Sequence, residues 1–262
     1  MSSEATSNAT CPLTWGDTDW VLLADHGAYL PARETLLVAD THFGKASIFS
    51  QAGIPAPAGV LRGTLERIDR MLAASGAGTL IILGDLWHGR LTEDDPARTA
   101  LAVWRRQRPG LTIRVVLGNH DRGSAGASAA LDMEVSDQID LGALRLQHTP
   151  AEITGRYVVA GHVHPVVRVP DLGKVAMRLP CFHLQPGCLT LPAVGAFTGG
   201  QRIQPQADDR IWVCGPGQIR ELPLTRKEKI SSSPISPRAA HSIEPQSSQN
   251  QSPGRKPGVK NP

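Results

Sequence analysis

Five short apolar segments of this chain end in clusters of Asp, His or Asn, and this pattern constrains the fold more than any other feature of the sequence. Each segment has the length and the Val, Ile and Leu content of a β-strand. In open α/β folds, sites gather outside the carboxyl ends of the strands. The sequence therefore predicts that residues spread between positions 40 and 164 meet in one site. The segments are "LLVADTH", "LIILGDLWH", "VVLGNHD", "LRLQH" and "VVAGHVH".

The rest of the pattern is that of an α/β sandwich. Apolar residues recur at helical spacing over 59–76, where Gly76 ends the predicted helix. A second helix is predicted over 96–110, beginning at a proline and closing before Pro109. This βαβαβ order is followed by further strands. The predicted strands span 20–24, 35–39, 79–83, 112–117, 141–148, 156–160, 189–194 and 210–214.

The composition divides the 262 residues into three parts. Residues 1–11 are expected to be flexible, and residues 12–225 to form a single domain. Residues 226–262 lack aromatic residues and are rich in Ser, Pro, Gln and Asn, so a disordered tail is expected there. The start of the chain lacks the pattern of an export signal, and no apolar run is long enough to cross a bilayer. We therefore expect a soluble cytoplasmic protein with no membrane partner.

The formal charge of +3 is unevenly distributed. The tail holds seven Lys/Arg and two Asp/Glu, which leaves 20 basic and 22 acidic residues, or −2, for the rest of the chain. The tail is either a weak nucleic-acid contact or simply a solvated segment. A near-neutral body argues against a protein whose affinity for DNA depends on counterion release along a duplex.

The polar clusters supply oxygen and nitrogen ligands for divalent transition ions such as Mn²⁺, Fe²⁺ or Zn²⁺. On an extended backbone, the first and third residues of Asp40-x-His42 and of His162-x-His164 point to one side. A glycine before the ligands lets the chain turn off the strand, including through positive φ. The glycines in question are Gly84, Gly118 and Gly161. Four cysteines without CxxC spacing support neither a disulfide framework nor a structural zinc site.

The ordered set D-x-H, G-D-x-x-H, G-N-H-D, H and G-H-x-H resembles the calcineurin-like metallophosphoesterase superfamily. The resemblance implies a four-layer αββα sandwich, with two mixed β-sheets flanked by helices. It also implies two metal ions, with Mn²⁺ the first choice. Asp85 would bridge the two ions, and His120 would stand by the substrate. Asp40, His42 and His164 would bind one ion, and Asn119, His148 and His162 the other.

The segments "ADTHFGKASIFSQAGIPAPAG", "RLPCFHL" and "LPAVGAFTGG" are similar to the bacterial DNA ligase-associated metallophosphoesterases, also called PdeM endonucleases. This narrower resemblance covers about residues 18–222. It departs from the family pattern at Thr41 and Val194, neither of which is a ligand. It implies an endonuclease acting on single-stranded or looped DNA in repair. An ATP-dependent DNA ligase, a helicase and an exonuclease are the implied partners.

Two metal ions about 3.5–4 Å apart can hold the attacking and leaving oxygens of an in-line displacement, with a bridging water deprotonated to the attacking hydroxide. His120 would donate a proton to the leaving alkoxide. We expect Asp121 to orient His120.

Four further residues are candidates for contact with the substrate. His88 either faces the site or packs against Trp87, and Lys45 either touches a phosphate or lies on the surface. Arg178 and His183 are expected to line the cleft because they lie in the family-like "RLPCFHL" segment.

Two other functions remain open at this point. The same metals would serve a small-molecule phosphoesterase, such as a nucleotide phosphatase or a cyclic-nucleotide phosphodiesterase, because only the cleft walls would differ. A non-catalytic scaffold is disfavoured, because relatives of that kind tend to lose the histidine of the G-N-H-D motif and this chain keeps His120.

Overall fold

The computed structural model describes residues 9–169 and 177–224. The predicted tail and residues 1–8 of the predicted flexible N-terminus lie outside the described residues. The first strand begins at Thr10, two residues before the expected start of the domain. No helix among the described residues is long and apolar enough to cross a membrane.

The first sheet has seven strands in sequence order. Its first four strands are antiparallel neighbours, and the strands from β4 to β7 run parallel. The strands are β1 (Thr10–Trp15), β2 (Thr18–Leu23), β3 (Gly27–Leu30), β4 (Thr35–Val38), β5 (Thr79–Leu83), β6 (Thr112–Val116) and β7 (Glu134–Ser136).

The second sheet has nine strands in the order β14-β11-β12-β13-β10-β9-β8, and β15 and β16 extend it from β12. It too is mixed, because β10 runs parallel to β9 and β13 while β12 runs antiparallel to its neighbours. The strands are β8 (Gln138–Leu141), β9 (Leu144–Gln147), β10 (Tyr157–Ala160), β11 (Pro165–Val169), β12 (Met177–Gln185), β13 (Cys188–Thr190), β14 (Gln201–Arg202), β15 (Arg210–Gly215) and β16 (Gln218–Glu221).

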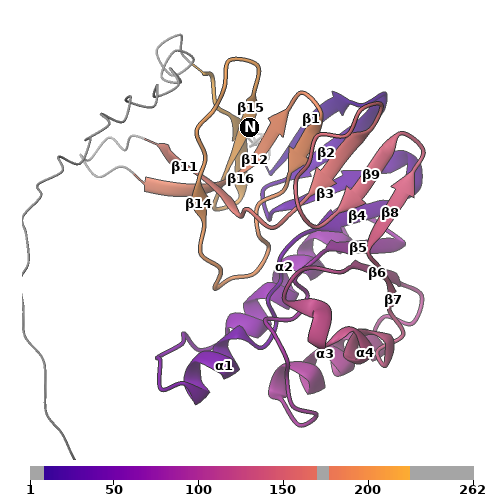
Figure 1. Cartoon of the computed structure of the whole chain (residues 1–262), viewed down its shortest axis with the longest axis vertical. Coiled ribbons are helices and arrows are strands. Elements are labelled where there is room, and N and C mark those ends of the chain that lie inside the picture. Colours follow the sequence, from indigo (N-terminus) through magenta and orange to yellow (C-terminus); the bar gives the residue numbers. More distant parts are fainter. Residues whose placement is uncertain (1–8, 170–176, 225–262) are drawn as a thin grey trace, which may run out of the picture. The chain divides into compact units, whose positions relative to one another are not determined.

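Four α-helices precede the second sheet in the described residues, and Figure 1 shows them gathered on one side of the first sheet. Gly76 ends α2 in the left-handed conformation, and Asp95 caps α3 by accepting the N–H of Ala97 at 2.8 Å. The helices are α1 (Lys45–Gln51), α2 (Val60–Ser75), α3 (Pro96–Arg106) and α4 (Ala125–Ala129), with short 3₁₀ turns η1 (Pro31–Arg33) and η2 (Asp121–Gly123).

The central parallel strands β4 and β5 are buried on both faces. Leu36 of β4 and Ile82 of β5 pack against α2 and α3, and the alternate residues Leu37 and Ile81 pack against the second sheet. The predicted α/β fold with two mixed sheets is therefore confirmed. In the described residues, however, no helix follows β7, so the second outer helical layer of a four-layer sandwich is not present in this part of the chain.

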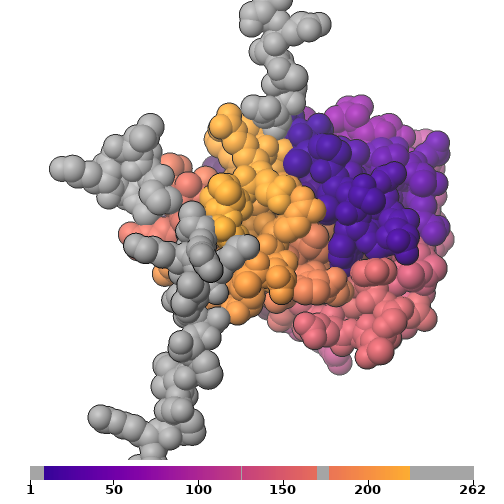
Figure 2. Space-filling view, turned by 90° about the horizontal axis from the view of Figure 1, so that it is seen from above, coloured from indigo at the N-terminus to yellow at the C-terminus, as the bar shows by residue number. Residues whose placement is uncertain are grey.

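Every predicted strand and helix corresponds to an element of the structure, and most of them have shifted ends. The region 141–148 is the main exception, because β8 ends and β9 begins inside it. Several strands were not predicted, among them β1 and β12. Figure 2 shows the N-terminal strands in indigo beside the orange C-terminal strands, where β1 contacts β16.

Candidate metal centre

Loops that follow five strands bring the predicted ligands together. Three of these strands, β4, β5 and β6, belong to the first sheet, and β9 and β10 belong to the second. The site therefore lies where the carboxyl ends of strands from two stacked sheets meet, as the sequence predicted.

The ligand atoms form two adjacent clusters. The first cluster consists of Asp40, His42 and His164, and the second of Asp85, His148 and His162. In each cluster, one imidazole nitrogen or carboxylate oxygen from every residue lies within 4.8 Å of the others. In the first cluster, His42 Nε2 lies 3.2 Å from His164 Nε2. In the second, His148 Nε2 lies 2.9 Å from His162 Nδ1.

Asn119 joins the second cluster from the loop after β6. Its Oδ1 lies 3.0 Å from His148 Nε2. The other ring nitrogen of His148 lies 3.2 Å from the carbonyl oxygen of Leu83, to which it donates when it carries the proton. This contact leaves Nε2 free to present a lone pair to the cluster.

Asp85 lies between the two clusters. Its Oδ2 is 3.8 Å from His42 Nε2 and 3.6 Å from His148 Nε2. Its Oδ1 is fixed by the backbone N–H of His120, which donates to it at 3.0 Å. One carboxylate oxygen is thus placed between imidazoles of both clusters, which is the position required of a shared ligand.

These residues fit a pair of divalent cations. Asp40 Oδ1 is buried and has no hydrogen-bond partner among the described residues, and it lies 3.5 Å from His164 Nε2. An unpaired buried carboxylate oxygen is costly unless a cation compensates it. The ring nitrogens also face one another at the spacing of about 3 Å that ligands around one ion adopt when each lies about 2.0–2.1 Å from it.

The backbone at the ligands is strained. Five predicted ligands adopt φ between 47° and 70°, the left-handed region that non-glycine residues rarely occupy. Such residues cost about 1–3 kcal/mol each and gather at functional sites. The extended backbone expected for the D-x-H and H-x-H pairs is therefore wrong. The five residues are Asp40, His42, Asp85, His162 and His164.

The three glycines before the ligands all leave room for a ligand side chain, and Gly84, beside His148, also adopts positive φ. Gly84 has φ +81°, as expected for a sharp turn off β5. Gly118 and Gly161 do not have positive φ; they are needed because a side chain would strike a ligand. A Cβ on Gly161 would lie 2.6 Å from Asp40 Oδ2, and one on Gly118 would overlap the carboxylate of Asp85.

His88 and His120 stand beside the first cluster. Their rings stack with centroids 4.9 Å apart and an interplanar angle of 21°. His88 Nδ1 lies 3.1 Å from His42 Nδ1, so one ring donates a hydrogen bond to the other. This bond fixes the orientation of His42. His88 therefore faces the site, whereas Trp87 is fully buried in the core and donates to Ser128.

The imidazoles of the first cluster and its neighbour His88 differ in how the site shifts their pKa values. Burial, together with the nearby His164, lowers the pKa of His42 to about 2. Burial and the charge of Lys45 lower the pKa of His88 to about 4. Burial acts in the same direction on His164, but the nearby Asp40 carboxylate favours its protonated form strongly enough to raise the pKa of His164.

Asp121 makes no hydrogen bond to the His120 ring, contrary to the role predicted for it. Its buried carboxylate instead accepts three backbone N–H groups, from Trp87 at 2.9 Å, Gly118 at 2.9 Å and Leu86 at 3.3 Å. These contacts tie the loop after β5 to the loop after β6. Asp121 therefore holds the backbone that carries the ligands, and it acts on the site through that backbone.

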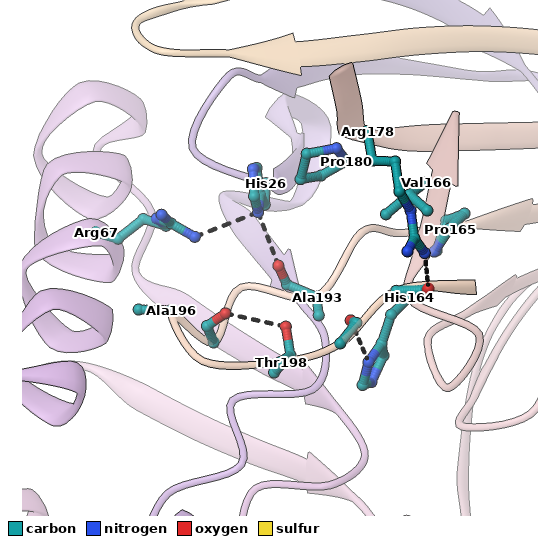
Figure 3. Close-up of a pocket in the computed structure, with 13 residues that line it drawn as sticks. His26, Arg67, His164, Pro165, Val166, Arg178, Pro180, Ala193, Ala196 and Thr198 are labelled. Carbon is teal, nitrogen blue, oxygen red and sulfur yellow. Dashed lines mark hydrogen bonds between the residues drawn. The ribbon is translucent and has the colours of Figure 1, made fainter. Parts of the chain in front are cut away.

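The predicted substrate contacts lie in different places. Arg178 lines a cavity of about 560 Å³ that adjoins His164, and its Nη2 donates to the carbonyl of Gly200 at 2.6 Å (Figure 3). His183 does not line this cavity; it is buried, and its Nε2 lies 2.7 Å from Asp209 Oδ2. Contrary to the expectation that it lines the cleft, His183 forms a buried pair with Asp209 that links β12 to the start of β15.

Two residues of that cavity were missed by sequence reasoning. His26 Nδ1 donates to the carbonyl of Ala193 at 2.7 Å, and Arg67 reaches toward it from α2 (Figure 3). Burial and the charge of Arg67 lower the pKa of His26 to about 4. Neither residue stands in a recognisable motif, so only the tertiary fold brings them beside His164.

The solved structure of Pseudomonas putida nuclease MPE matches this chain with 37% sequence identity and a TM-score of 0.71, covering 81% of this chain and 100% of that one. The chain belongs to the metallophosphoesterase family. The match and the two adjacent clusters make it a metal-dependent phosphoester hydrolase whose site suits two ions.

Two other solved structures are more distant. YfcE, a phosphoesterase from E. coli, is 21% identical over 68% of this chain and 86% of its own, with a TM-score of 0.37. The AQ665 protein from Aquifex aeolicus is 22% identical over 54% of this chain and 82% of its own, with a TM-score of 0.35. No protein-family profile matches the chain, and no curated protein gives a significant match.

Proposed function

We propose that this metallophosphoesterase is an endonuclease that hydrolyses phosphodiester bonds in unpaired or looped DNA. The observation that carries the proposal is the Asp85 carboxylate between two His/Asp clusters, in a chain 37% identical to a protein described as a nuclease. A near-neutral body supports a short, local contact with the strand and disfavours a long electrostatic grip on a duplex.

The chain's own residues divide the work of hydrolysis. When bound, a pair of divalent ions supplies Lewis-acid charge and an activated water for in-line attack on phosphorus. Asp40, His42 and His164 would hold one ion, and the second cluster with Asn119 the other. As the bond from phosphorus to the leaving oxygen breaks, a ring nitrogen of His120 gives a proton to the alkoxide. The products are a phosphate monoester end and a free hydroxyl end.

The choice of Mn²⁺ as the working ion is part of this proposal, with Fe²⁺ and Zn²⁺ as alternatives. The donor set of carboxylate, imidazole and amide oxygen is compatible with all three. Metal-depleted protein supplied separately with Mn²⁺, Fe²⁺, Zn²⁺ and Mg²⁺ should recover most activity with Mn²⁺. Highest activity with Mg²⁺ would count against a site built largely from imidazoles.

The decisive assay offers the metal-loaded protein circular single-stranded DNA, the same circle as a duplex, and simple phosphate diesters. We expect preferential nicking of the single-stranded circle. Hydrolysis of small esters with no nicking would instead identify a small-molecule phosphoesterase. His120→Ala should lower turnover about 10²–10⁴-fold while metal content stays near that of the wild type. Arg106→Ala, an exposed change at the end of α3, is the matched control and should leave turnover unchanged.

We further propose that the enzyme works in DNA repair alongside an ATP-dependent DNA ligase, a helicase and an exonuclease. Support comes from the resemblance of residues 39–59 and 191–200 to the ligase-associated family. A ligase partner requires nicks with a 3′-hydroxyl and a 5′-phosphate. Nicked product should therefore be sealed by such a ligase without further processing, and products that need end repair would argue against this partnership.

A further inference from the structure

The aromatic residues of this chain are few, and two of them lie outside every hydrophobic core. The sequence has five Trp, two Tyr and four Phe, and all of them fall within the described residues. Nine are buried in or packed against the two main cores. Phe49 of α1 and Phe197 of the loop between β13 and β14 belong to no core cluster in the described part of the chain. Both are half-buried.

These two rings meet each other although they are almost 150 positions apart. Their centroids are 5.6 Å apart at an interplanar angle of 80°. Phe49 also contacts the ring of His88, at 6.0 Å and 67°. Because His88 stacks on His120 at 4.9 Å, the two phenyl rings extend an aromatic series that begins at the proposed proton donor. Neither ring helps to form a core, so their packing beside the site calls for another explanation.

Lys45 adds a positive charge to the same place. Its Nζ lies 5.5 Å from the centroid of Phe49 and 5.6 Å from that of Phe197. No carboxylate lies within 4.0 Å of it among residues 9–169 and 177–224. A half-buried ammonium with no carboxylate partner is available to a phosphate that approaches the rings.

We propose that Phe49 and Phe197 form a stacking platform for one unpaired nucleobase next to the scissile phosphate, with Lys45 contacting a phosphate of the same strand. This inference rests on the proposed nuclease function and deepens it. Bases in a duplex are already stacked on their neighbours, so only an unpaired base can use the platform without a cost for unstacking. Stacking also accepts every base, because every base has a π face.

The near-neutral charge of the body favours a platform of this kind. With 20 basic and 22 acidic residues outside the tail, the domain has little net charge with which to hold a DNA backbone. Stacking on aromatic side chains is worth about 1–3 kcal/mol per base. One stacked base therefore contributes roughly 5- to 150-fold in affinity. The platform accounts for a preference for single strands, which a bimetal centre alone would not give.

The test uses a short single strand in which only one linkage is a hydrolysable phosphodiester. An abasic site is placed on either side of that linkage in turn, and kcat and KM are measured for each strand. For wild-type protein we expect a loss of about tenfold in kcat/KM on one of the two abasic strands, within the range given by stacking. The Phe49→Leu, Phe197→Leu double variant should lose about tenfold on the intact strand and nothing more on that abasic strand.

Two further variants separate stacking from mere support of α1. Phe197→Trp keeps an aromatic face and should restore most of the loss seen in Phe197→Leu, whereas a supporting role would favour Leu over the bulkier Trp. Ile54→Ala removes an exposed apolar side chain just after α1 and should behave as wild type on every strand.

The outcomes are distinct. Equal cleavage of intact and abasic strands by the wild type would overturn the platform and leave the nuclease proposal intact. So would a double variant that loses a further tenfold in kcat/KM on the abasic strand, because the base and the rings would then act independently. No cleavage of any strand, with hydrolysis of small esters, would overturn both.

Discussion

Replacing Asp121 with Asn is expected to destabilise the protein, because this carboxylate holds two ligand-bearing loops together. The two oxygens accept N–H groups of Leu86, Trp87 and Gly118. An asparagine offers one acceptor oxygen. If that oxygen serves Leu86 and Gly118, the side-chain amide NH₂ faces the N–H of Trp87, and two buried donors oppose each other.

The size of the effect follows from these contacts. A buried donor left without a partner costs about 1–3 kcal/mol, and the remaining bonds lose the strength that the charge of the carboxylate gave them. Burial raises the pKa of Asp121 against the lowering effect of its N–H donors, so removing the charge recovers some desolvation energy. A net loss of about 2–3 kcal/mol in the free energy of unfolding is expected.

Urea unfolding of metal-depleted protein at pH 7 measures this loss directly. Asp140→Asn is the matched control, because that carboxylate is exposed to solvent and paired with Arg145, and its replacement should cost less than about 1 kcal/mol. If Asp121→Asn unfolds within about 0.5 kcal/mol of the wild type but shows a changed pH profile of turnover, Asp121 acts on His120 after all. The account of the loops would then be refuted.

Three other outcomes are expected. Gly161→Ala should lower the metal content and destabilise the protein by about 1–3 kcal/mol, because its Cβ would lie 2.6 Å from Asp40 Oδ2. Gly187→Ala, where a Cβ meets nothing within 4 Å, is the control and should change neither the metal content nor the stability. The pKa of His26 is lowered from 6.5 to about 4, so the folded state binds fewer protons than the unfolded state between these values. Acidification from pH 7 toward 4 should therefore cost up to about 3 kcal/mol, and His26→Gln should unfold with a flatter pH dependence. The pKa of His164 is raised through Asp40, so metal ions must displace its proton, and their affinity measured by calorimetry should fall as the pH is lowered.

The convergence of the ligands could be predicted from the sequence because the ends of strands are local features. Apolar runs such as 79–83 define a strand, and the first polar residues after it lie at the sheet edge whatever the rest of the chain does. The glycine pattern was informative as well, although its reason was only half right. Close approach explains Gly118 and Gly161, and only Gly84 has the expected positive φ. The predicted ligands themselves also adopt positive φ, which side-chain identity does not reveal.

What the sequence could not supply are contacts that depend on tertiary packing. Asp121 follows His120 directly, which suggested a pair, but two of its three partners are backbone N–H groups of a loop about 35 residues earlier. His183 lies in a family-like segment, yet its partner Asp209 is contributed by a distant turn. The contact between α1 and the 195–200 loop is equally invisible, because isolated phenylalanines carry no periodic signal.

The most direct test of the account is the anomalous scattering of Mn²⁺ in crystals of the loaded protein. Two manganese peaks are expected, with the carboxylate of Asp85 between them and with His42 and His148 on opposite sides. A single peak, or two peaks that do not share Asp85, would contradict the binuclear centre on which the proposed hydrolysis depends.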